Sequence, residues 1–299
     1  MRKIKWLNAF LFILPALLIY LTFFLYPAID TFRLSFYDLT GMGLNKQFIG
    51  LANFRQAIIH DAVFWDSVRS TLVIVVVGGI LVFGGALFYS MIFSRYRVKG
   101  KGFFKTLVIL PIAISHIAIG IGWTFIYNGR WGLLNNILRS IGLEELAKPW
   151  LGFPEYALPA IIVVVFWMQI GFYTLLLLAG LESIPTVYEE AAIVDGASNW
   201  TIFTKILFPL LKGVFTTSAL YWIMNMLKIF AIIWVLTGAG LSSTLFTLST
   251  YTYRMAFGQQ VASYRFGYAS AIAVLLFLFS IVFSIFYLRL ISKKEVHQY

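Results

Sequence analysis

The polar stretch that decides the fold covers residues 188–212 and reads YEEAAIVDGASNWTIFTKILFPLLK. It contains acids, amides, glycine and lysine, yet it lies between two runs that are apolar enough to cross a bilayer. Water must therefore reach it, or another protein must cover it, because unsatisfied polar groups are costly in lipid. The role of the stretch depends on which side of the membrane it faces.

Composition places the whole chain in a membrane. Hydrophobic residues make up 61% of the sequence and charged residues 12%, and the mean hydropathy is +0.87, far from soluble-domain averages. A spanning helix needs about 20 mostly apolar residues, so the sequence predicts an all-α integral membrane protein with a single transmembrane domain over 1–299. The six predicted membrane helices cover about 9–29, 71–93, 106–127, 158–180, 215–236 and 269–291.

Basic residues predict the orientation, because they are retained on the cytoplasmic side of a membrane. They cluster in the short segments 1–8, 94–105 and 289–294. Both termini are therefore expected in the cytoplasm, and so is the polar loop 182–213. The first run is too long for a cleaved signal peptide and is expected to remain as a helix. The same clustering accounts for the net charge of +11 without nucleic acid.

Local patterns predict a helix, a turn and a second helix in the polar loop. Thr186 and Glu189 have capping-box spacing, which would start a helix near residue 187. Gly196 is suited to a left-handed stop, and Ser198 can cap a second helix that runs to about Phe208, before Pro209.

The first of these helices has a face of small residues. Tyr188, Ala191, Ala192 and Asp195 recur at helical spacing, so the two alanines are expected together on that face. A helix face with small side chains permits close approach by a partner. The alternative is an ordinary amphipathic loop helix.

The spacing of the loop resembles the EAA motif of the membrane-spanning permease subunits of ABC importers. The matching positions are Glu190, Ala191, Ala192, Gly196, Ile206 and Pro209, whereas Phe208 replaces the usual leucine. The resemblance implies a coupling helix that lies in a cleft of a cytoplasmic ATPase. Glu190, Ala191, Ala192, Gly196, Tyr188 and Asp195 are then the expected ATPase-coupling residues.

The resemblance extends over nearly the whole chain and is to the maltose-type branch of carbohydrate importers. Further matching stretches are FIGLANF at 48–54, LPIAIS at 110–115, GLESIP at 180–185 and YTYRMAF at 251–257, whereas TGAGLSS at 237–243 replaces a frequent Gly-Gly-Pro. The resemblance implies a type I ABC importer permease fold in the bacterial inner membrane. It also implies a second permease subunit, two ATPases that bind ATP and Mg²⁺, and an extracytoplasmic solute-binding protein. The chain itself is expected to bind no cofactor and to catalyse no reaction.

Polar residues inside the predicted helices are the candidates for solute binding, because such residues usually face a bundle interior or a wet cavity. His116, Gln169 and Asn225 each lie near the middle of a predicted helix and offer donors and acceptors suited to sugar hydroxyls. Hydrogen bonds between helices are the alternative role. Lys228 is expected to be structural. Aromatic residues that could stack on sugar rings are Phe172, Tyr173 and Trp222.

Two other solute classes and two other protein classes are open alternatives. Importers of glycerol phosphate or a polyol share the architecture. A stand-alone secondary transporter would carry membrane-embedded acids, but none of the six runs contains Asp or Glu. A membrane enzyme would need a convergent acid–base or metal set, and the sequence shows no such set and no phosphate-binding loop of the form GxxxxGK[ST].

Overall fold

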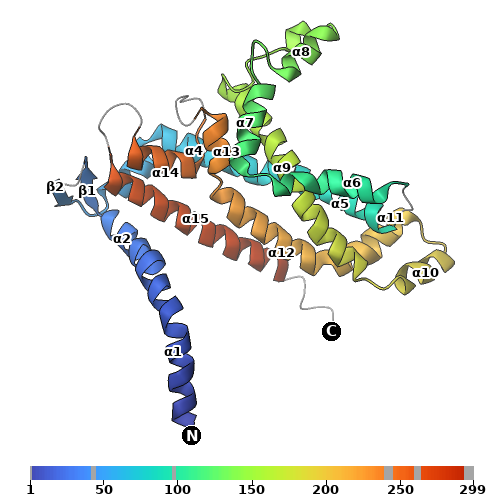
Figure 1. Cartoon of the computed structure of the whole chain (residues 1–299), viewed down its shortest axis with the longest axis horizontal. Helices are drawn as coiled ribbons and strands as arrows, with labels where there is room; N and C mark the ends of the chain where they lie inside the picture. The colour runs from blue at the N-terminus through green and yellow to red at the C-terminus, as the bar shows by residue number, and fades with distance from the viewer. Residues whose placement is uncertain (1, 42–44, 96–98, 239–244, 259–263, 293–299) are drawn as a thin grey trace. The chain divides into compact units, whose positions relative to one another are not determined.

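The computed structural model describes residues 2–41, 45–95, 99–238, 245–258 and 264–292 (Figure 1). Within these residues five helices are long and apolar enough to cross a membrane, and a bent helix pair makes a sixth span if it counts as one. The predicted helical membrane fold is confirmed. The sidedness of the termini stays a prediction, and the 239–243 part of TGAGLSS lies outside the described residues. The five spans are Asn8–Leu34, Ala62–Arg95, Pro154–Glu182, Asn199–Leu227 and Phe266–Arg289.

Two compact units divide the chain, one of Met1–Trp65 with Tyr251–Leu278 and one of Asp66–Thr250 with Phe279–Tyr299. The first unit begins with α1 (Arg2–Tyr20), which continues through a π-helical turn into α2 (Tyr26–Leu34). In the span Asn8–Leu34, none of the most apolar window is buried inside the chain. The side chains of this window are therefore available to lipid or to another subunit. The single-domain prediction is not tested by this division.

A small hairpin and two short helical segments follow in the first unit. Strands β1 (Tyr37–Thr40) and β2 (Asn45–Phe48) pair antiparallel, with Tyr37 opposite Phe48. Buried Asn53 on α3 (Ala52–Arg55) donates to the carbonyls of Ser35 and Tyr37, both at 3.0 Å. These two bonds fix the hairpin to the segment that follows it, and the hairpin was not predicted.

A half-buried carboxylate joins segments of the first unit that are distant in sequence. Asp61 accepts hydrogen bonds from the hydroxyls of Tyr251 on α14 (Leu248–Phe257) and Tyr268 on α15 (Phe266–Ser292). Burial opposes ionisation of Asp61, but these bonds and those from the amides of Phe64 and Val63 outweigh it and lower its pKa. The charged form of Asp61 thus stabilises this unit.

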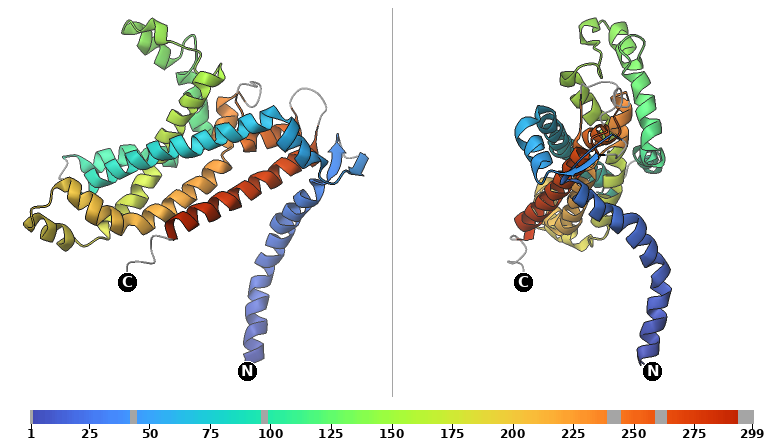
Figure 2. Two further views of the ribbon diagram at one scale, coloured as in Figure 1. Left: turned by 180° about the vertical axis from the view of Figure 1, so that it is seen from behind. Right: turned by 90° about the vertical axis from the view of Figure 1, so that its left-hand side faces the viewer.

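The second unit is built around two long helices (Figure 2). α5 (Gly79–Arg95), which continues α4 (Ala62–Val73) through a π-helical turn, packs along α9 (Pro154–Glu182). Their contact is apolar and closely packed: Val82, Ala86, Ile161 and Val165 are fully buried. Lipid tails are as apolar as these side chains, so close van der Waals packing rather than exclusion of water holds the two helices together.

The third predicted helix, 106–127, is wrong as a straight span. The chain forms α6 (Lys101–Ile109) and a 3₁₀ turn (Leu110–Ala113) before α7 (His116–Ile126), and the pair is bent by 104°. Pro111 lacks a donor for the helix ladder, and the Ser115 hydroxyl accepts from the amide of Ala118 and so caps a new helix. The connection to α9 contains α8 (Leu133–Ser140) and a 3₁₀ turn (Glu144–Leu146).

The fifth predicted helix also has different bounds. α11 (Asn199–Ile202), a π-helical turn (Phe203–Leu207) and α12 (Phe208–Leu227) form one continuous helix, so the predicted stop near Phe208 and the predicted span 215–236 are wrong. The π-helical turn ends at Leu207, shortly before Pro209, and accommodates the backbone donor that proline lacks. The chain then leaves helical geometry at Lys228–Phe230 and resumes as α13 (Ala231–Leu236).

Candidate functional site

A cavity of about 440 Å³ lies in the second unit, between the 3₁₀ turn after α6, the start of α7, the middle of α9 and the end of α12. Its wall is mixed, with amides, an imidazole, an ammonium group and aromatic rings among aliphatic side chains. A volume of this size accommodates a small ligand. The lining residues are Pro111, Ile112, His116, Met168, Gln169, Phe172, Tyr173, Tyr221, Asn225, Met226, Lys228, Ile229, Phe230, Ala231 and Ile232.

Two breaks between described helices of the second unit lie at the cavity. The bend between α6 and α7 contributes Pro111 and Ile112, and the break after α12 contributes Lys228, Ile229 and Phe230. Non-helical backbone at membrane depth is tolerated where it is buried in protein or lines a cavity. Because two separate breaks meet at one hollow, the hollow has the features of a ligand site rather than of a packing defect.

The structure brings the three predicted polar residues together in the cavity wall. Gln169 and Asn225 are half-buried on α9 and α12, whereas His116 is exposed and is the first residue of α7 rather than a mid-helix residue. The Asn225 amide nitrogen donates to the carbonyl of Tyr221 at 2.8 Å. This bond orients the amide, whose oxygen and second N–H are what Asn225 can offer a solute. That they bind one stays a prediction.

The aromatic candidates divide into two groups. Phe172 and Tyr173 line the cavity, and so does Tyr221, which the sequence did not single out; the Phe172 and Tyr221 ring centroids are 5.6 Å apart. Trp222 is outside the lining. It is 2% exposed, and its indole N–H donates to the carbonyl of Val75 at 2.8 Å. Trp222 therefore joins two helices. Tyr173 is only 1% exposed, so the aromatic surface offered to a solute is mainly that of Phe172, Tyr221 and Phe230.

Lys228 lies in the wall of the cavity. The sequence predicted a structural role for this residue and did not place it near the solute-binding candidates. It is exposed and directly follows the last residue of α12. Among the described residues that line the cavity, none is acidic. The wall contributed by this chain therefore has a positive charge. An uninterrupted helix from Asn199 to Leu236 would greatly exceed the roughly 20 residues of one span. This length is the feature of the sequence that could have predicted a break near Lys228.

The polar loop forms α10 (Val187–Val194), a turn and α11, as the sequence predicts. Gly196 has a φ of +77°, the left-handed conformation that stops α10, and the Ser198 hydroxyl accepts from the amide of Thr201 at 3.2 Å. The capping box is wrong. Thr186 has helical backbone angles and makes no side-chain cap, because Glu189 is directed to Arg95 instead, with 2.8 Å between its Oε1 and Arg95 Nη2.

Most of α10 is open to a partner. Tyr188, Glu190, Ala191 and Asp195 are exposed, but Ala192 is buried in the apolar core, so the expected pair of docking alanines is reduced to one. At this position the core accommodates the small side chain of Ala192. The helical spacing of the residues does not show that this alanine faces the core. Four large apolar side chains of α10 and α11 that the sequence did not single out are also exposed: Val187 and Ile193, each at 60%, Trp200 at 72% and Val194 at 87%.

These features are those of a multi-pass membrane protein with a cavity between its helices, and the comparisons with known proteins identify it as a component of an ABC importer. The model of the family described as "Binding-protein-dependent transport system inner membrane component" matches residues 85–296, and the chain belongs to that family. It is thus a permease subunit in the inner membrane, a transport component and not an enzyme. No group of three potential metal-ligating side chains occurs within the described part of the chain.

Three similar proteins show what kinds of transport system contain subunits like this chain. The trehalose/maltose transport system permease protein of Thermococcus litoralis is 34% identical over 290 residues, 96% of this chain and 95% of the relative. The sn-glycerol-3-phosphate transport system permease protein of Agrobacterium fabrum is 30% identical over 286 residues, 95% and 94% of the two chains. A crystal structure of a bacterial ABC transporter for import of alginate matches with a TM-score of 0.83 at 24% identity, covering 99% and 98%.

Proposed function

We propose that this permease subunit moves a sugar or small oligosaccharide into the cytoplasm through the cavity at the two helix breaks. The observation that carries the proposal is the composition of that cavity. His116, Gln169 and Asn225 offer neutral hydrogen-bonding groups next to the rings of Phe172 and Tyr221. Hydroxyl groups pair with such donors and acceptors, and the apolar face of a pyranose ring packs on aromatic side chains. The name of the Thermococcus relative supports a sugar.

The proposed complex contains further subunits that this chain cannot replace. A second permease would complete the membrane pathway, and two ATPases would supply energy with their own ATP and Mg²⁺. The exposed face of α10 supports ATPase docking, with Glu190 and Asp195 as charges at its edge. A binding protein would deliver solute from outside, as the family description indicates. Closure of the ATPases on ATP would then move α10 and switch the cavity between its two orientations.

Gln169→Leu and Asn225→Leu should each weaken solute binding while the complex still assembles. One neutral hydrogen bond contributes about 0.5–1.5 kcal/mol, so the half-saturation concentration should rise about 2- to 10-fold. Uptake of maltose and trehalose into vesicles with the complete complex measures the effect. The matched control is Thr124→Val. It removes a hydroxyl that donates to the Ile121 carbonyl on α7, and Thr124 is absent from the cavity lining. A loss of thermal stability with unchanged half-saturation would instead show that the two amides only connect helices.

An anionic solute is the second candidate, and Lys228 is the observation that favours it. The cavity wall contributed by this chain has this one ammonium group and no acid among the described lining residues. An ammonium group attracts phosphate, sulfonate or carboxylate strongly where water is scarce. The relative from Agrobacterium fabrum is named for glycerol 3-phosphate, which has such a group.

Lys228→Met distinguishes the two candidates. A charge-assisted hydrogen bond contributes about 1.5–3 kcal/mol, so uptake efficiency for glycerol 3-phosphate should fall about 10-fold or more if the solute is an anion. Maltose uptake should change little if the solute is neutral. Lys228→Arg preserves the charge and serves as the control. Uptake of both solutes in the same vesicle preparations decides the class, and an equal small change for both would remove Lys228 from solute recognition.

A further inference from the structure

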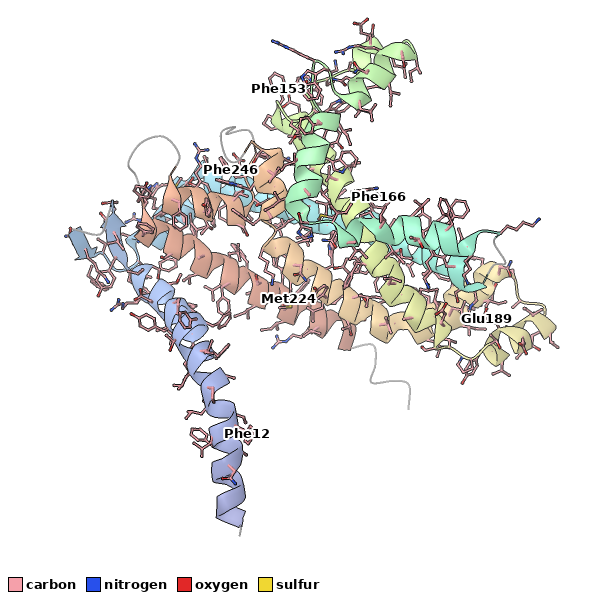
Figure 3. The ribbon with its side chains drawn as sticks, viewed as in Figure 1. Phe12, Phe153, Phe166, Glu189, Met224 and Phe246 are labelled. Atoms are coloured by element: carbon pink, nitrogen blue, oxygen red, sulfur yellow. The ribbon has the colours of Figure 1, made fainter. Side chains whose placement is uncertain are left out.

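A single arginine connects the end of α5 to two other segments. Arg95 is the last residue of α5, and its Nη2 donates to the carbonyl of Leu181 at 3.1 Å, near the end of α9. The same nitrogen is 2.8 Å from Oε1 of Glu189 on α10. Figure 3 labels Glu189 on this helix. Three helices that are separate in sequence thus meet at one guanidinium group.

This ion pair is shielded from water. The Arg95 side chain is 16% exposed and the Glu189 side chain 17%, so salt screens their attraction less than that of a surface pair. Removing one partner would leave the other as an uncompensated, mostly buried charge. The pair Asp30–Arg33 provides the contrast, because it lies within α2 and its side chains are 28% and 59% exposed.

Two adjacent acids on α10 point to different surroundings. Glu190 is exposed on the side that a partner can reach, whereas Glu189 is directed into the chain toward Arg95. Ala192, one turn further, is buried against the core of the second unit. α10 is therefore attached to the helix bundle on one side by an ion pair and an alanine contact, and its opposite side is open.

We propose that the Arg95–Glu189 pair is the positioning contact that transmits movement of α10 to the helices that form the cavity. This inference rests on the proposed importer function. Displacement of α10 pulls Glu189, and Arg95 passes that displacement to α5 and, through the Leu181 carbonyl, to α9. Gln169 lies twelve residues before Leu181 on the same helix, which corresponds to about 18 Å along a rigid element. The contact thus connects the docking face to the cavity wall.

Glu189→Gln and Arg95→Met test the contact in vesicles that hold the permeases, ATPases and binding protein. The readout is solute transported per ATP hydrolysed, because a purely structural role would lower stability without changing this ratio. We expect assembly and basal ATP hydrolysis to persist and the ratio to fall about 5-fold or more, within the usual range of coupling between sites. The control is Arg33→Met, which breaks an ion pair inside one helix.

The charge-reversed double variant, Arg95→Glu with Glu189→Arg, keeps the inference testable if a single variant does not assemble. Partial recovery of the ratio over either single variant supports the contact. A ratio equal to wild type in Glu189→Gln overturns it, and so does a double variant no better than Arg95→Glu alone. Absence of uptake by the wild-type complex would contradict the proposed function instead, so the two failures are distinguishable.

Discussion

Gly171→Ala is expected to prevent stable assembly of the second unit. An added Cβ at Gly171 on α9 would lie 2.2 Å from the carbonyl oxygen of Val108 and 2.9 Å from the Cα of Ile109. Both are backbone atoms of α6, so no side-chain rotation relieves the overlap. Overpacking typically costs about 1–3 kcal/mol and more when backbone must move, and we expect the upper end of that range.

The consequence extends to the cavity, because the turn after α6 contributes Pro111 and Ile112 to its wall. The apparent melting temperature and yield of the purified complex measure the loss. Gly84→Ala on α5 is the matched control, since nothing lies within 4 Å of its added Cβ, and alanine should favour the helix there by about 1 kcal/mol. Wild-type stability for Gly171→Ala would show that α6 and α9 separate easily.

Val194→Asp is expected to abolish capture of the ATPase subunits while leaving the permease fold intact. Val194 is 87% exposed at the end of α10, so the chain alone tolerates a carboxylate there. In the proposed docked complex the same carboxylate would be buried without a partner, at a cost of about 3–5 kcal/mol. That cost corresponds to a loss of affinity on the order of 100-fold or more.

Copurification of the ATPases with tagged permease, and ATP-dependent uptake, measure this effect. Val194→Thr has nearly the same shape without charge and should retain most of the association. If Val194→Asp captures ATPase as well as Val194→Thr does, α10 is an ordinary solvent-exposed loop helix and the coupling role is refuted.

Patterns that depend on neighbouring residues were predictable from the sequence. The left-handed turn at Gly196 and the cap at Ser198 were both correct, because each depends on the backbone conformation of a few consecutive residues. The capping box failed although its spacing is regular. Glu189 had a competing partner in Arg95, far away in the sequence, and a charged partner in a shielded site outweighs a local amide.

The sequence by itself determined that the chain is an apolar helical membrane protein and that a polar segment interrupts it, because hydropathy and the residues that start and stop helices are local properties. Only the tertiary structure decided that the third span bends by 104° and that the fifth helix ends at Leu227. It also decided that Trp222 faces Val75 rather than the cavity. These outcomes depend on which helices pack together, and packing matches surfaces that no single segment specifies.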